Sequence, residues 1–80
     1  MRVQINLDTM KNVQRFVNIA SAHKANVYIT DNAGLCVSAK SLLGALYAME
    51  FDELWCECDE DIFTAIKDFV IYWFYKKFML

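Results

Sequence analysis

The stretch RVQINLDTMKNVQRFVNIA, residues 2–20, decides the fold, because its hydrophobic period changes within a few residues. Val3, Ile5 and Leu7 alternate with polar side chains, which is typical of a half-buried strand. Asp8 or Thr9 can then cap a helix through a side-chain oxygen. Apolar residues recur every three or four positions after that cap, namely Met10, Val13, Phe16, Val17 and Ala20. The opening of the chain therefore predicts a strand followed by a helix with one buried face.

The middle of the chain predicts a hairpin. Alternation resumes over residues 26–30, and Asp31-Asn32-Ala33-Gly34 has the composition of a turn. Leu35 and Val37 then continue the inward alternation, so that we expect a second strand to pair with the first.

Three further elements complete the pattern. Ser38 or Ser41 can open a short helix over Leu42–Met49. A fourth strand follows, with Leu54, Cys56 and Cys58 on one side. The acidic run at 59–61 then favours the start of a long last helix, and Lys76 and Lys77 favour its end. We therefore expect a single α+β domain over residues 1–80, an open-faced β-sandwich in which three helices cover one face of a four-stranded antiparallel sheet.

Composition narrows the class of protein. The 80 residues are 58% hydrophobic and contain no proline, which excludes a disordered tail. The formal charge is −2, and the sequence shows no basic patch of the kind that binds nucleic acids. Four charged side chains interrupt the apolar stretch 62–80, which argues against a membrane span. The start of the sequence lacks the layout of a signal peptide and the cysteines are odd in number, so we expect a cytoplasmic protein with reduced thiols.

Several segments resemble the HPr-like phosphocarrier family of the bacterial sugar phosphotransferase system. They are Val17-Asn18-Ile19-Ala20-Ser21, the strand at 26–29, and Val37-Ser38-Ala39-Lys40-Ser41-Leu42-Leu43-Gly44, which is similar to the regulatory-serine region of the family. The order of the predicted elements also fits. The resemblance covers nearly the whole chain and implies the HPr-like form of the open-faced sandwich.

The phosphate-carrying motif of that family, Gly-Leu-His-Ala-Arg-Pro, is missing. Counted back from Val17, the histidine position holds Thr9 and the arginine position holds Lys11. A threonine phosphate ester is too stable to pass its phosphate on readily, and Asp8 would repel an anion. The only histidine, His23, lies near the far end of the same helix, where a structural role is favoured. We therefore expect a degenerate member of the family that is not an enzyme and does not relay phosphate.

Ser41 is the sharpest functional candidate. In the HPr-like family, a kinase phosphorylates the matching serine, and a transcriptional regulator then recognises the phosphorylated serine. The resemblance implies the same role for Ser41. Leu42, Leu43 and Leu46 would then form the docking surface for such a protein partner. The alternative is that Ser41 only caps the short helix.

The last helix supports a second hypothesis. The run Phe69–Tyr75 is apolar around the whole circumference of a helix, and excess apolar surface commonly marks an interaction site. Val70, Trp73 and Phe74 would then form the surface of a homodimer or of another protein-binding module unrelated to sugar transport. Its alternative is a deeper core.

The cysteines favour packing over metal binding. Cys56 and Cys58 are two apart on a strand and point the same way, whereas Cys36 faces the opposite side of its sheet. A zinc site needs four ligands, usually from closely spaced pairs. We expect no metal and no cofactor.

Overall fold

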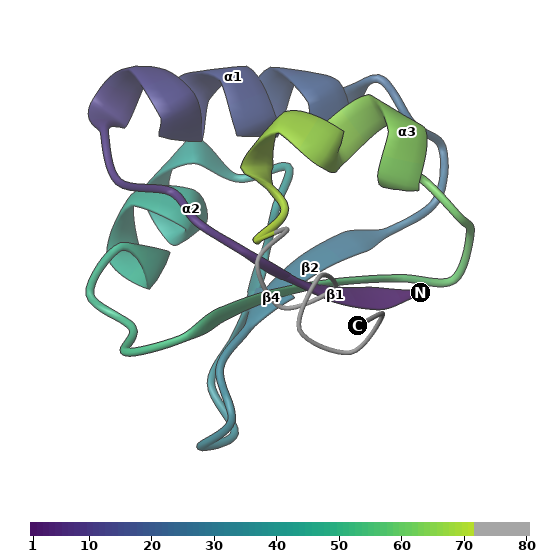
Figure 1. The fold of residues 1–80 in the computed structure, drawn as a ribbon. Coiled ribbons are helices and arrows are strands. Elements are labelled where there is room, and N and C mark those ends of the chain that lie inside the picture. Colours follow the sequence, from purple (N-terminus) through teal and green to yellow (C-terminus); the bar gives the residue numbers. More distant parts are fainter. Residues whose placement is uncertain (72–80) are drawn as a thin grey trace.

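The computed structural model describes residues 1–71 and shows an α+β domain with an open four-stranded antiparallel sheet and three α-helices. In chain order the elements are β1 (Arg2–Ile5), α1 (Met10–Ser21), β2 (Val27–Thr30), β3 (Cys36–Ser38), α2 (Leu42–Ala48), β4 (Leu54–Cys58), α3 (Phe63–Ile66) and the 3₁₀ turn η1 (Lys67–Phe69). All three helices lie on one side of the sheet (Figure 1). The predicted fold class is confirmed at this level.

The strand order is β1-β4-β2-β3, so that the last of these strands, β4, lies between β1 and β2 and pairs with both. Cys56 in β4 lies opposite Val3 in β1 and opposite Ile29 in β2. These three residues are buried and face the helices. Their pairing fixes the register at the centre of the sheet, because a slip of one residue would turn every one of them to the other face.

Helix α1 packs on the sheet through Val13, Phe16, Val17 and Ala20, which are buried as the sequence predicts. Met10 does not belong to this stripe, since 64% of its surface is exposed. It is the first residue of the helix. In the core, the ring of Phe16 meets the ring of Phe69 edge to face at 5.2 Å between centroids.

Helix α2 approaches the sheet through small residues. Ala45 and Ala48 are fully buried, and a Cβ atom added at Gly44 would lie 3.3 Å from the Cβ of Val37. This close packing leaves the larger side chains of α2 on its other faces. In the preceding hairpin, Leu35 does not face inward as predicted; it is exposed, because it follows Gly34, whose φ of +95° turns the chain into β3.

The prediction of one long last helix is wrong. The α-helical part ends at Ile66, one 3₁₀ turn follows, and Val70 is extended. Val70 pairs with Ile5, the Asn6 N–H donates to the Phe69 carbonyl at 2.8 Å, and the Ile71 N–H donates to the Gln4 carbonyl at 3.1 Å. The outer edge of β1 thus gains partners for backbone groups that a helix would leave unpaired. In the region up to Ile71, no helix has the length and apolarity needed to cross a bilayer.

Candidate functional site

The start of α1 is where the resemblance implies a phosphate-carrying centre. The Thr9 hydroxyl accepts a hydrogen bond from the Asn12 N–H at 3.1 Å, so Thr9 is the cap of this helix. Lys11 is exposed on the first turn. The structure therefore gives Thr9 a structural partner and leaves Lys11 in solvent.

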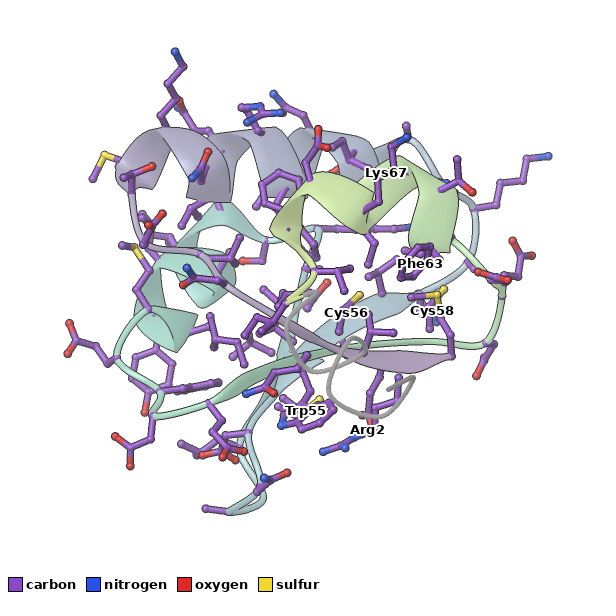
Figure 2. All side chains as sticks on the ribbon, in the orientation of Figure 1. Arg2, Trp55, Cys56, Cys58, Phe63 and Lys67 are labelled. Carbon is purple, nitrogen blue, oxygen red and sulfur yellow. The ribbon has the colours of Figure 1, made fainter. Side chains whose placement is uncertain are left out.

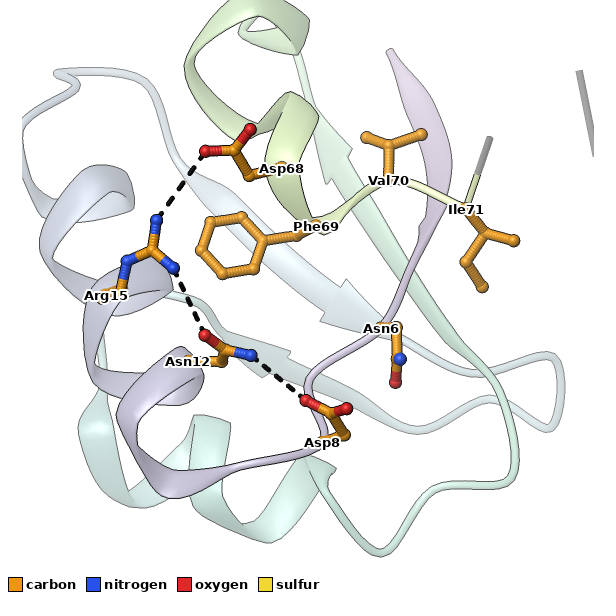
Figure 3. Close-up of a pocket in the computed structure, with 8 residues that line it drawn as sticks. All are labelled: Asn6, Asp8, Asn12, Arg15, Asp68, Phe69, Val70 and Ile71. Carbon is orange, nitrogen blue, oxygen red and sulfur yellow. Dashed lines mark hydrogen bonds and ion pairs between the residues drawn. The ribbon is translucent and has the colours of Figure 1, made fainter. Parts of the chain in front are cut away.

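A cavity of about 480 Å³ lies beside this helix start, between the segment that follows β1, helix α1 and the end of η1 (Figure 3). A polar chain runs along its wall: Asn12 Nδ2 donates to Asp8 Oδ1 at 3.1 Å, Arg15 donates to Asn12 Oδ1 at 3.3 Å, and Arg15 lies 3.7 Å from Asp68 Oδ2. The guanidinium of Arg15 also lies 5.3 Å from the centre of the Phe69 ring. Each of these polar groups thus has a neighbour within the wall.

The chemistry available in this cavity is limited. The eight lining residues are Asn6, Asp8, Asn12, Arg15, Asp68, Phe69, Val70 and Ile71, and none of them carries an imidazole, thiol, hydroxyl or amine. Two carboxylates face one guanidinium, and this guanidinium is already paired with Asp68. The lining therefore offers no histidine to form a phosphoramidate and no excess of positive charge for an anion.

His23 lies away from this cavity, at the end of α1. Its Nδ1 atom is 2.9 Å from the Ile19 carbonyl oxygen, which can only accept, so the ring donates from Nδ1. The Lys40 ammonium approaches the same helix end and donates to the His23 carbonyl at 2.6 Å. These two contacts satisfy carbonyl groups at the end of a helix, which is a structural role.

Ser41 is exposed at the start of α2, and its hydroxyl oxygen accepts a hydrogen bond from the Gly44 N–H at 3.1 Å. The structure therefore places Ser41 at the cap position. The residue is also exposed, as modification by a kinase would require.

The residues after Ser41 separate into two groups. Leu42 and Leu43 are exposed, and Leu43 is the most open of the large apolar residues described, with 81% of its surface exposed. Leu46 is half-buried and packs against the core, so it is not part of this surface. Tyr47 takes that place, since it is 56% exposed and lies one helical turn after Leu43. We refer to Leu42, Leu43 and Tyr47 as the α2 face.

The surface predicted for a homodimer is not confirmed. Val70 is only 6% exposed and pairs with β1, which removes it from any outer surface. Trp73 and Phe74 lie outside the described residues.

The cysteines are placed as the sequence predicts. Cys56 and Cys58 are buried beneath the helices, and Cys36 is exposed on the other side of the sheet. Burial raises the pKa of the Cys56 thiol from its usual 9.0 to about 12. Within residues 1–71, no three His, Cys, Asp or Glu side chains gather as a metal site requires.

The open face of the sheet carries a polar cluster. The guanidinium carbon of Arg2 lies 4.1 Å from the centre of the Trp55 ring, and Arg2 Nε pairs with Glu57 at 3.0 Å. Figure 2 shows Arg2 and Trp55 side by side beneath the sheet, on the side away from the helices. Arg2 therefore covers one face of the indole through a cation–π contact.

Sequence reasoning missed two parts of this arrangement. The spacing of Asp8, Asn12 and Arg15 along one helix start could have indicated a polar row, whereas the contact of Arg15 with Asp68 is tertiary and leaves no local signal. Tyr47 could have been found from its four-residue spacing to Leu43.

No protein-family model, curated protein or solved structure matches this chain.

Proposed function

We propose that this chain is a non-catalytic, HPr-like domain that binds a protein partner through the α2 face and does not relay phosphate. The observation that carries the proposal is the exposure of Leu43 and Tyr47 one turn apart on a helix whose opposite side is closely packed on the sheet. Apolar side chains grouped in this way are costly to leave in water, and such groups commonly mark protein-binding sites.

The start of α1 supports the part of the proposal that excludes phosphate relay. The hydroxyl of Thr9 caps α1, and no histidine lines the cavity beside it. In this proposal the chain acts on other proteins through contact rather than through phosphate relay.

Ser41 supplies a means of control in this proposal. It directly precedes Leu42, so that a phosphate on its hydroxyl would put about two negative charges at the edge of the α2 face. The partner would be a regulator or a kinase of the phosphotransferase system, in the cytoplasm. Incubation with the serine kinase of that system and ATP, followed by mass spectrometry, tests this part: phosphate is expected on Ser41 and absent from the S41A variant.

The docking itself is tested with a photo-crosslinking amino acid at position 43, introduced in the native cells. The matched control has the same group at Thr64, which is exposed on α3. A discrete crosslinked product from position 43 that is missing from position 64 is expected. Equal products from both positions, or none from position 43, would overturn the proposal.

A further inference from the structure

We infer that the partner of the α2 face is a basic amphipathic helix, held by apolar contacts along α2 and by a cluster of carboxylates at the end of that helix. This inference rests on the proposed function, because it names the chemistry of the partner for the same surface.

The apolar face leads directly to the carboxylates. The Tyr47 ring meets the Phe51 ring at 5.5 Å between centroids, and Phe51 is followed by Asp52 and Glu53. Asp52 and Glu53 line a cavity of about 300 Å³ together with Asp31, from the turn between β2 and β3. Asn32 of that turn donates a hydrogen bond to Glu53, which holds the two loops together. We refer to Asp31, Asp52 and Glu53, with Glu50 just after α2, as the acidic rim.

The negative charge of the acidic rim is not balanced within the described part of the chain. The two ion pairs among residues 1–71 are Arg2–Glu57 and Arg15–Asp68, and neither includes a carboxylate of the rim. Arg2 reaches Asn32 beside the rim, but its charge is already matched by Glu57. A partner that brings Lys or Arg to this place would gain attraction without losing an existing ion pair.

The opposite end of α2 carries a different charge. Lys40 precedes Ser41, and its ammonium is bound to the carbonyl groups at the end of α1. The charged residue just before α2 is therefore a lysine, whereas carboxylates follow the end of the helix. This polarity gives the partner an orientation, with its basic residues over the end of α2.

The shape of the surface favours a helix as the partner. Leu43 and Tyr47 form a ridge at a spacing of four residues, and such a ridge packs into the groove of another helix. The carboxylates of the rim also disfavour an anionic membrane as the occupant, because both surfaces are negative.

The test is a selection of displayed, randomised helical peptides on the intact chain. A parallel selection uses the L43D variant, and another uses a variant with E50Q, D52N and E53Q, in which each substituted side chain keeps an amide oxygen as an acceptor. We expect the peptides selected on the native chain to have apolar residues four apart and a net positive charge. These peptides should bind the L43D variant and the charge-neutralised variant at least about tenfold more weakly than they bind the native chain.

Different failures identify different errors. Peptides that depend on Leu43 but carry no excess of Lys or Arg would overturn the inference and leave the proposed function standing. Peptides that bind the L43D variant as well as the native chain would overturn the proposed function. A dimer of the native chain that the L43D variant loses in sedimentation would show that a second copy is the occupant and would also overturn the inference.

Discussion

The ring of Tyr47 meets the ring of Phe51 nearly at right angles, with 5.5 Å between their centroids. This contact joins α2 to the loop that follows it. Because of this contact, the exposed apolar side chains of α2 and the carboxylates at 52 and 53 form one continuous surface. The basic partner inferred for this surface depends on that continuity.

Leu43 and Leu54 form a matched pair for separating binding from stability. Leu43→Ala is expected to change the free energy of unfolding by less than about 0.5 kcal/mol, because the side chain is exposed. Leu54→Ala removes a buried side chain and should cost about 2–5 kcal/mol. Urea unfolding followed by circular dichroism measures both. A large loss for Leu43→Ala would mean that Leu43 serves the fold.

Ser41 is expected to contribute to stability as a cap, whether or not it is modified. Ser41→Ala should destabilise the domain by about 1 kcal/mol, because the Gly44 N–H loses its acceptor. Ser41→Asp keeps a capping oxygen and should remain close to the native chain. Equal stability of all three proteins in urea unfolding would show that the hydrogen bond contributes nothing measurable.

The cysteines should differ strongly in reactivity toward iodoacetamide. At mildly alkaline pH, a pKa of about 12 leaves Cys56 with about a thousandfold less thiolate than a thiol at 9.0. Cys36 is exposed and should be alkylated in the folded chain, while buried Cys56 reacts only after unfolding. Peptide mass spectrometry reads the order, and rapid labelling of Cys56 in the native chain would contradict its burial.

The raised pKa of Cys56 also predicts how the stability of the folded state changes with pH. The folded state holds the Cys56 proton more tightly than the unfolded state, so this group contributes stability below pH 9 and loses it as the pH rises from 9 towards 12.

Exposure to phosphoenolpyruvate and the general phosphotransferase enzyme should leave the chain unlabelled. Thr9 holds the position where the resemblance implies a histidine, and its hydroxyl already caps α1. Radiolabelled phosphoenolpyruvate with an active HPr protein as a positive control measures this. An acid-labile phosphate on any residue of the chain would restore a carrier role.

The sequence predicts most elements up to residue 58, because each of them has a local signal. Alternation marks β1 and β4, and the side chains of Thr9 and Ser41 mark the starts of α1 and α2. The end of α3 has no such signal. The chain leaves the helix because Val70 pairs with Ile5 at the free edge of β1. This edge exists only in the assembled sheet, so the local sequence does not indicate it.

The candidate site was predictable in part for similar reasons. Leu42 and Leu43 are exposed as expected, but Leu46 turns to the core and Tyr47 outward. This rotation follows from the close approach of Gly44 to Val37, which fixes the side of α2 that meets the sheet. The acidic rim joins two loops about twenty residues apart in sequence, so its assembly depends on the register of β2 and β4.

The location of the bound partner on the chain is the most direct test of the proposed binding surface. A ¹⁵N-labelled sample is titrated with a peptide from the selection, and the backbone amide shifts are followed by NMR. Binding through the α2 face and the acidic rim predicts that the largest changes fall between Leu42 and Glu53. Changes concentrated instead on Asn6–Arg15 and the residues around Asp68 would place binding in the cavity beside α1 and contradict it.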